Sequence, residues 1–283
     1  MSKAIILQHV AHEGPGRIVP LFRDFGIPTE VRHLYRGDEV PTDLDEIRLL
    51  VSLGGPMGVA DLGKPEFAWM DAEVALLKRM VELDRPTLGI CLGAQLLAHA
   101  AGARVYKNVK MAPPAGPGQP PKPVEPEEPL PEIGWGPVSL PFPGGTEPIV
   151  FGVADGTPFF HWHFDTFDLP AFPKPATPPP PGPPPPTGNA LIASTRTCRN
   201  QAFRFKTKLF GFQFHFELDR PGITSLVNGN RDEAARVLGS DFEARINLDT
   251  EKHYPRFERA GNKMLTNFVQ FLRAYNTAHY AAD

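Results

Sequence analysis

Cysteine is scarce in this sequence, and long apolar runs are missing from it. Cys91 and Cys198 are the two cysteines among 283 residues, so neither a disulfide-stapled secreted fold nor a cysteine-rich zinc module is expected. No stretch approaches the ~18 apolar residues of a membrane helix. The apolar run at the N-terminus is also shorter than the core of a signal peptide. These absences predict a cytoplasmic protein that does not bind membranes.

An excess of one charge is missing as well. The 29 Lys and Arg residues nearly balance the 32 Asp and Glu residues, which leaves a net charge of −3. A nucleic-acid-binding domain usually carries a marked basic excess. We therefore expect no nucleic-acid partner.

Proline, by contrast, is abundant, with 34 residues of which most lie in the middle of the chain. The segments 112–131 and 173–187 hold nine and ten prolines, so neither can form a helix or an interior strand. We interpret both as polyproline-rich loops inserted into a single domain over 1–283. The last part of that domain, 219–283, is predicted to be a helical extension.

The remaining sequence alternates between strand-like and helix-like patterns. Apolar runs that end in glycine or polar turns are typical of buried parallel strands, and they occur at 4–10, 30–35, 47–55 and 85–91. Apolar residues at helical spacing lie between some of these runs. Further strand-like runs follow at 133–140, 148–153, 159–164, 189–195, 201–205 and 208–217. The alternation predicts an α/β fold with an open, mostly parallel, doubly wound sheet that continues on both sides of each proline tract.

Cys91 stands in a pattern that suits a nucleophile. The run Gly89-Ile90-Cys91-Leu92-Gly93 has the form G-x-nucleophile-x-G between a predicted strand and a predicted helix, which is the setting of a nucleophile elbow. The N-terminus of the following helix favours a thiolate. The alternative is a small buried core residue, the more common fate of a free cysteine, and this is what we expect of Cys198.

His215 and Glu217 supply the base that a cysteine nucleophile needs. In the run 208–217 aromatic residues alternate with other side chains, as in a strand. Residues two apart share a face of a strand, so we expect the imidazole and the carboxylate to point the same way while Phe214 and Phe216 enter the core. A carboxylate placed in this way can orient an imidazole. The alternative is a half-exposed strand with solvated polar residues.

The turn Leu53-Gly54-Gly55-Pro56 is glycine-rich, so a ligand can approach its backbone closely. The N–H groups of Gly55 and Leu92 are candidates for an oxyanion hole, the alternative being an ordinary tight turn. A phosphate-loop spacing over 58–64 lacks the following Ser or Thr. No nucleotide or other cofactor is therefore predicted.

A cluster of polar residues occurs in the segment 161–165, which reads HWHFD. His161, His163 and Asp165 occupy alternate positions, which in a strand would share a face and suggest a metal ion. Two imidazoles and one carboxylate without further ligands are weak evidence for such a site. We expect no metal, and interpret these residues as part of a pocket or of a strand end.

Three motifs, G-G-P, G-x-C-x-G-A-Q and F-H-x-E, occur in this order along the chain. In them the sequence resembles the class I glutamine amidotransferases, in particular the stand-alone, GMP-synthase-like branch. The resemblance covers 3–110 and 132–217 and implies a flavodoxin-like fold. It also implies that Cys91 attacks the side-chain amide of glutamine, that His215 protonates the departing ammonia and that Glu217 orients the imidazole.

The same resemblance implies roles for residues around this predicted triad. Gln95 is expected to hydrogen-bond the glutamine substrate, and His163, Phe164 and Asp165 to present backbone to its amino and carboxylate ends. Many relatives have glycine between the last His and Asp of this segment. Phe164 stands there in this chain, so the pocket is expected to be narrower or its backbone altered.

Three functions remain open at this point. The first is a glutaminase that delivers ammonia to a separate synthase subunit, and the second is an autonomous hydrolase of γ-glutamyl amides or peptides. Both would use the same residues and the same γ-glutamyl thioester. The third is an inactive amidotransferase-like scaffold whose proline tracts bind a polyproline-recognising partner.

Overall fold

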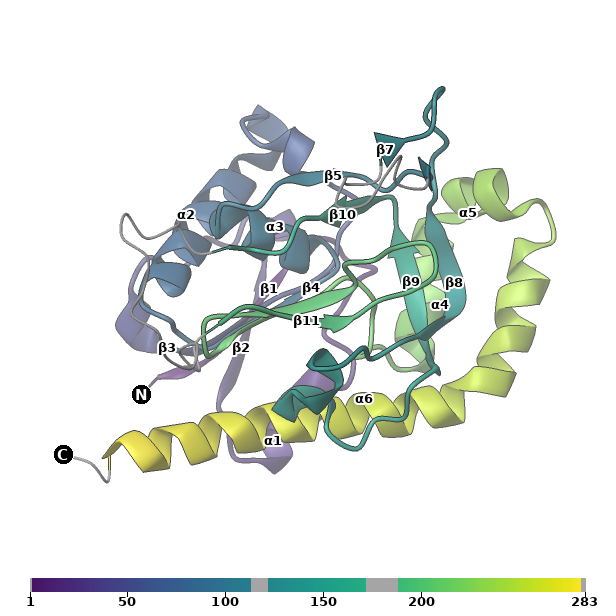
Figure 1. Cartoon of the computed structure of the whole chain (residues 1–283). Helices are drawn as coiled ribbons and strands as arrows, with labels where there is room; N and C mark the ends of the chain where they lie inside the picture. Colours follow the sequence, from purple (N-terminus) through teal and green to yellow (C-terminus); the bar gives the residue numbers. More distant parts are fainter. Residues whose placement is uncertain (1, 113–121, 172–187, 281–283) are drawn as a thin grey trace.

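A computed structural model describes residues 2–112, 122–171 and 188–280 of the chain (Figure 1). The side chains of 275–280 lie outside this description. The regular elements in the described residues are β1 (Lys3–Gln8), α1 (Ile18–Asp24), β2 (Thr29–His33), β3 (Ile47–Ser52), α2 (Ala68–Glu82), β4 (Thr87–Ile90), α3 (Leu92–Ala100), β5 (Val105–Lys107), β6 (Met111–Ala112), β7 (Lys122–Pro123), β8 (Glu132–Val138), β9 (Thr157–His163), β10 (Asp165–Phe167), β11 (Ala190–Ala193), β12 (Ala202–Phe205), β13 (Leu209–Phe212), α4 (Arg220–Gly229), α5 (Arg231–Leu238) and α6 (Phe242–Tyr280).

The centre of the molecule is a seven-stranded sheet in the order β11-β12-β13-β4-β3-β1-β2. The pairs from β13 to β2 are parallel, and β11 and β12 are joined to the sheet by antiparallel pairs. Helices cover both faces of this sheet (Figure 1). The predicted fold class, an open and mostly parallel α/β sheet between helices, is thus confirmed.

Strand β1 illustrates why this sheet lies between two layers of helices. Its residues from Ala4 onward are all buried, and successive side chains of a strand point to opposite faces. Ile5 and Leu7 pack in the core that contains α2 and α3, whereas Ala4 and Ile6 pack in the core that contains α1 and α6. A strand that is apolar on both faces needs cover on both sides.

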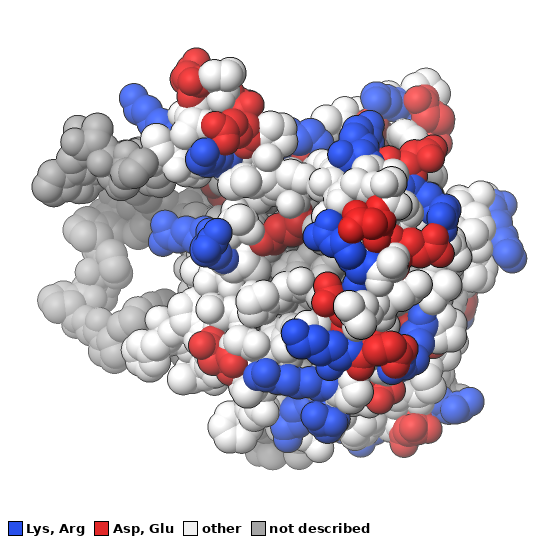
Figure 2. All heavy atoms as spheres, turned by 90° about the vertical axis from the view of Figure 1, so that its right-hand side faces the viewer, with Lys and Arg blue, Asp and Glu red and all other residues white. Residues whose placement is uncertain are grey.

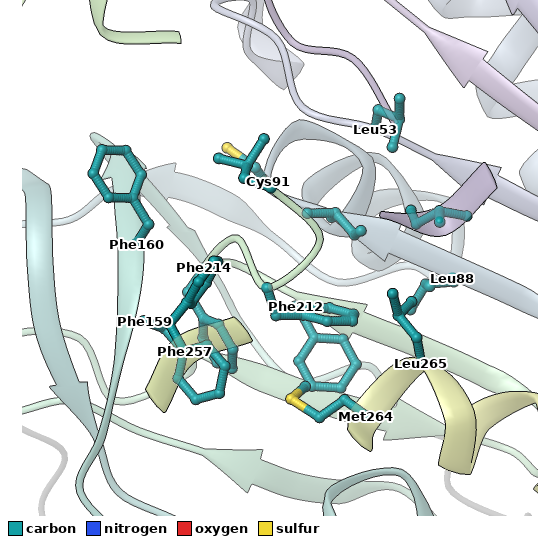
Figure 3. Close-up of a cluster of buried hydrophobic side chains, with 14 of the residues drawn as sticks. Leu53, Leu88, Cys91, Phe159, Phe160, Phe212, Phe214, Phe257, Met264 and Leu265 are labelled. Carbon is teal, nitrogen blue, oxygen red and sulfur yellow. The ribbon is translucent and has the colours of Figure 1, made fainter. Parts of the chain in front are cut away.

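The core on the α6 side is dominated by aromatic rings. Phe212 and Phe214 pack against each other with ring centroids 5.6 Å apart, and Phe214 lies 4.5 Å from Phe159. Figure 3 shows Cys91 at the margin of this cluster, with its sulfur pointing away from Phe212 and Leu265. Packed aromatic side chains therefore lie on one side of the nucleophile candidate.

Three predictions about strands were wrong. β8 and β9, which lie between the proline tracts, form an antiparallel ladder of their own and do not extend the main sheet. The predicted strand at 148–153 is instead a 3₁₀ helix, Pro148–Val150, which begins at a proline. The strand predicted to reach residue 217 ends at Phe212.

Helix α6 runs for 39 residues along one face of the molecule. It contains Pro255, which removes an internal hydrogen bond and bends a helix, and Figure 1 shows α6 curving as it passes the sheet. Phe257, Met264 and Phe268 are fully buried on it, as the helical spacing predicts. Buried side chains thus occur on α6 from Phe242 to Val269, and the helix packs against β8 and β9 as well as against β13 of the main sheet.

The proline tracts are only partly described. All of 173–187 and residues 113–121 of the first tract lie outside the described residues. β6 and β7, which lie on either side of residues 113–121, form a two-residue antiparallel ladder away from the main sheet. Single-domain organisation with two insertions stays a prediction. Among the described helices none is both long enough and apolar enough to cross a lipid bilayer.

Candidate active site

Cys91 occupies a sharp turn between β4 and α3. Its φ of +52° and ψ of −111° are a strained conformation for a residue with a side chain. Two flanking glycines make the turn possible: a Cβ on Gly89 would collide with the backbone of Gly93, and a Cβ on Gly93 would collide with the backbone of Ser52. The predicted strand–elbow–helix setting of the cysteine is present, and its thiol donates to the carbonyl oxygen of Trp162 over 3.4 Å.

His215 and Glu217 lie together beyond the end of β13, in an irregular segment. The backbone N–H of His215 donates to the carbonyl oxygen of Phe160 at 2.8 Å. Its Nδ1 lies 2.7 Å from Oε1 of Glu217, and because a carboxylate can only accept, Nδ1 is the donor. The other oxygen of Glu217 accepts from the N–H of Phe216 at 2.9 Å. The predicted pairing is thus present, although strand geometry does not produce it.

The Nε2 atom of His215 has no hydrogen-bond partner among the described residues. Burial disfavours the imidazolium, but the charge of Glu217 and the interaction with Cys91 outweigh it and raise the pKa of His215. Burial raises the pKa of Cys91, and His215 together with the N–H of Leu92 opposes that shift. Each of the two groups therefore shifts the pKa of the other toward its charged form.

A buried arginine fixes the segment that carries this pair. Arg17 donates from its guanidinium to the carbonyl oxygens of Phe216 at 2.5 Å and of Glu258 at 2.6 Å, and its backbone N–H donates to the carbonyl oxygen of Glu217 at 2.8 Å. Glu258 lies on α6 and Arg17 precedes α1. The sequence analysis did not single out Arg17, because its partners are about 200 or more residues away along the chain.

The predicted oxyanion-hole residues lie side by side. A Cβ on Gly55 would come 3.0 Å from Cδ2 of Leu92. The neighbouring carbonyl of Gly54 is 3.0 Å from Nδ1 of buried His9, whose Nε2 lies 2.8 Å from the carboxylate of Glu73. Burial lowers the pKa of His9, but Glu73 outweighs this and raises it. His9 in its charged form therefore donates at both nitrogens and holds the glycine turn.

A cavity of about 360 Å³ opens onto Cys91. The predicted residues that line it are Gly55, Gln95, His163, Phe164 and Asp165. Leu92, His215 and Glu217 are themselves at most 2% exposed. Thus the structure places the predicted substrate-contacting residues and the predicted nucleophile around one cavity.

Gln95 reaches the site through a neighbour that the sequence analysis missed. Its side-chain amide donates to the side-chain oxygen of Gln213 at 3.2 Å, and the amide nitrogen of Gln213 lies 3.8 Å from the sulfur of Cys91. Both glutamines are buried. This pair fixes the amide of Gln95 beside the nucleophile.

The two histidines of the HWHFD segment lie beside Glu132 and not beside Asp165. Nε2 of His163 lies 2.8 Å from Oε2 of Glu132, and Nδ1 of His161 lies 3.6 Å from the same atom. Asp165 instead forms an ion pair with Lys107 at 2.7 Å. Asp165 therefore does not join the two rings, because Glu132 on β8 reaches across the ladder to both of them.

Ligand atoms of Glu132, His161 and His163 all lie within 4.8 Å of one another, so these residues could hold a metal ion. The carboxylate, however, also accepts hydrogen bonds from the hydroxyls of Thr195 and Thr197 and from an amide of Gln201. Burial raises its pKa, but the hydrogen bond from His163 and the charge of His161 outweigh that and lower it to about 2. Donors from the protein thus satisfy the carboxylate, and the cluster fixes His163 at the cavity wall.

The C-terminal region supplies a wall of the cavity that was not predicted. This wall is formed by residues on or just before α5, namely Asn230, Glu233 and Arg236. Glu233 accepts from the indole N–H of Trp162 at 2.7 Å. Acidic and basic side chains are interspersed over the face of the molecule that α5 and the start of α6 form (Figure 2). Glu13, from the loop after β1, also lines the cavity and was missed.

Comparisons with known proteins agree with this arrangement. The family model described as glutamine amidotransferase class-I matches residues 17–123. A putative glutamine amidotransferase-like protein, YfeJ, of Salmonella typhimurium is 26% identical over 236 residues, which are 83% of each chain. A GMP synthase (glutamine-hydrolysing) of Lachnospira eligens is 36% identical over 66 residues, covering 23% of this chain and 12% of that one.

Solved structures give the same result for the fold. A glutamine amidotransferase from Thermotoga maritima superimposes with a TM-score of 0.71 at 22% identity, over 96% of this chain and 97% of the other. The family model and the named relative make the sequence similar to class I glutamine amidotransferases, and the solved structures share its fold.

Proposed function

We propose that this protein hydrolyses the side-chain amide of glutamine, or of a γ-glutamyl compound, through a thioester on Cys91. One observation carries the proposal: Glu217 anchors Nδ1 of His215, while Nε2 stays unpaired among the described residues and is coupled to the buried sulfur. This is the arrangement that a cysteine nucleophile and its base require. The similarity of the chain to class I glutamine amidotransferases supports the same reaction class.

In the first half of the reaction, Sγ of Cys91 adds to the amide carbon while its proton passes to Nε2 of His215. The oxygen of the tetrahedral adduct becomes negative and is held by the N–H groups of Gly55 and Leu92. The imidazolium then gives its proton to the amide nitrogen, the carbon–nitrogen bond breaks, and ammonia or an amine leaves. Glu217 holds the ring in the required orientation and stabilises its charge.

In the second half, a water molecule replaces the amine. His215 takes a proton from the water, whose oxygen attacks the thioester carbonyl, and the same oxyanion hole serves again. The carbon–sulfur bond breaks, the free carboxylate is released and the proton returns to the sulfur. Gln95 and His163 line the cavity where the glutamyl part would lie, and Lys107 offers a cation for its carboxylate.

The fate of the nitrogen separates two versions of this function. In the first version ammonia passes to a separate synthase, as the likeness to a glutamine-hydrolysing GMP synthase suggests. In the second the enzyme is a free-standing γ-glutamyl hydrolase. The cavity extends past the sulfur to α5, which leaves room for a leaving group larger than ammonia and favours the second version.

The test is hydrolysis by the purified chain with and without cell extract, together with labelling by a glutamine-like chloromethyl ketone. We expect one adduct, on the peptide that contains Cys91, and loss of at least about 1,000-fold in kcat for Cys91→Ala. Cys198→Ala is the matched control, because Cys198 is buried and bonded to Thr166. Undiminished turnover by Cys91→Ala would refute the mechanism, and stimulation by extract would support the synthase version.

A further inference from the structure

Glu13 is an acidic residue at the cavity that the proposed mechanism does not use. It lies in the loop after β1, lines the cavity and is 6% exposed. Its carboxylate makes no hydrogen bond to any described residue. Nε2 of His12 lies 3.9 Å from one of its oxygens. Burying a carboxylate without a partner is costly. A ligand that donates a hydrogen bond to this carboxylate would offset that cost.

The position of Glu13 relative to His215 indicates which part of a substrate it faces. A Cβ on Gly54 would collide with Oε2 of Glu13 and lie 3.0 Å from Cε1 of His215, so the carboxylate and the imidazole pack against the same glycine. Cε1 is bonded to Nε2, the atom that gives its proton to the leaving nitrogen in the proposed mechanism. The carboxylate of Glu13 therefore lies beside the ring that gives its proton to the leaving nitrogen in the proposed mechanism.

Two imidazoles and two carboxylates act on Glu13. Burial is the largest influence and raises its pKa to about 7; His215 and His9 oppose this shift, and Glu217 and Glu233 add to it. Burial lowers the pKa of His12, so this ring is a poor counter-charge at neutral pH.

The opposite side of the cavity differs in its charge pattern. Lys107 there pairs with Asp165, and Gln95 offers an amide, which suits the zwitterionic glutamyl part of a substrate. Arg236, the basic residue of the α5 wall, is exposed at the outer end. Near the scissile bond Glu217 pairs with His215 and Glu233 accepts from Trp162, so Glu13 is the carboxylate there without a hydrogen bond from the described residues.

We propose that Glu13 is a specificity-determining residue that selects γ-glutamyl amides whose leaving amine carries a second, positively charged nitrogen. The inference rests on the proposed function. An ammonium group two or three bonds beyond the scissile nitrogen would donate to Glu13 and replace the missing partner, with Glu233 adding a longer-range attraction. An anionic leaving group would meet two carboxylates and bind poorly.

The experiment compares three amides of near-equal size: γ-glutamyl-ethylenediamine, γ-glutamyl-propylamine and γ-glutamyl-β-alanine, whose leaving groups are cationic, neutral and anionic. For the wild type we expect kcat/KM to fall in this order, with about a 10-fold or larger advantage of the cationic over the neutral amide, the size of one charge-assisted hydrogen bond. Glu13→Gln should remove most of this ratio, and Glu13→Asp should keep part of it.

The pH dependence of the same ratio gives a second test. The advantage of the cationic amide should grow as pH rises through about 7, where Glu13 loses its proton. Glu13→Gln should show a flat ratio. The groups that face Glu13 are His9, His12, His215, Glu217 and Glu233. Glu13→Gln keeps all of them, so a pH dependence of the ratio that persists in this variant belongs to them and not to Glu13.

The matched control is Glu251→Gln, which removes an exposed carboxylate that pairs with Arg220 on the surface; the ratio should stay at the wild-type value. Glu13→Gln removes a buried charge that has no partner, so its melting temperature at about pH 8 should be no lower than that of the wild type. Equal kcat/KM for the three amides in the wild type, or an unchanged ratio in Glu13→Gln, would overturn the inference. Hydrolysis of glutamine but of none of the three amides would overturn it as well, whereas hydrolysis of neither glutamine nor the amides would refute the proposed function.

Discussion

The two halves of the candidate active site are held in place in different ways. The nucleophile half, from β4 to α3, is fixed by its backbone: Cys91 sits in a strained turn, and Gly93 is pressed against Ser52 so closely that it has no room for a methyl group. The base half, beyond β13, has no regular structure and is held by hydrogen bonds from side chains, chiefly Glu217 and Arg17. Steric exclusion fixes the first half, and polar contacts fix the second.

This difference has a physical consequence. A packing clash propagates into the backbone and costs stability, whereas a lost hydrogen bond in a local network mainly changes the orientation of one group. Substitutions in the nucleophile half should therefore destabilise the fold. Substitutions in the base half should chiefly reduce the rate of the reaction.

The largest effect is expected for Glu217→Gln. A side-chain amide can no longer accept at both positions, so the ring of His215 loses the acceptor that fixes its Nδ1 proton, and kcat should fall by about 1,000-fold or more. Urea denaturation should give a free energy of unfolding close to that of the wild type. A fall in stability as large as the fall in rate would show that the base half is as rigid as the elbow.

Gly93→Ala should show the opposite balance. The new methyl group collides with the backbone of Ser52, and we expect a loss of on the order of 3 kcal/mol in the free energy of unfolding. The control is Gly188→Ala, because a Cβ on Gly188 meets no atom of the described residues within 4 Å. If both variants unfolded at the same urea concentration, close packing would not be what fixes the nucleophile.

A smaller effect is expected for Arg17→Met. The segment that carries His215 keeps its bond to Glu217 but loses the guanidinium that holds the carbonyl of Phe216, so kcat should fall about 10-fold, at nearly constant KM, for a loss of about one charged hydrogen bond. Arg23→Met serves as the control, because Arg23 is an exposed arginine on α1, the helix that follows Arg17. A change confined to KM would show that Arg17 affects substrate binding and not the base.

Sequence patterns predicted the nucleophile half well because its determinants are local. Glycines two residues on either side of Cys91, an apolar strand before it and a helix after it are all visible within about 15 residues. The parallel strands were predicted for the same reason, since each is a short apolar run. The likeness to the amidotransferase motifs added His215 and Glu217, whose pairing the structure contains.

The base half was predicted less well because it depends on contacts between distant parts of the chain. Strand alternation was extended past Phe212, where the backbone leaves the sheet. Glu132 replaced Asp165 beside the histidines because it lies on the partner strand of a ladder that sequence periodicity does not pair. The α5 wall and Glu13 carry no local pattern that distinguishes them from solvated charges.

The contacts of Arg17 also bear on the point during synthesis at which the proposed activity can begin. A growing chain that has been made as far as Glu217 already contains every residue of the proposed triad. It still lacks Glu258 and Asn262 on α6, two of the groups that receive the guanidinium of Arg17. Because the loss of these contacts is expected to slow the proposed reaction and not to abolish it, a nascent chain should reach its full rate toward glutamine once the region around residue 262 has left the ribosome.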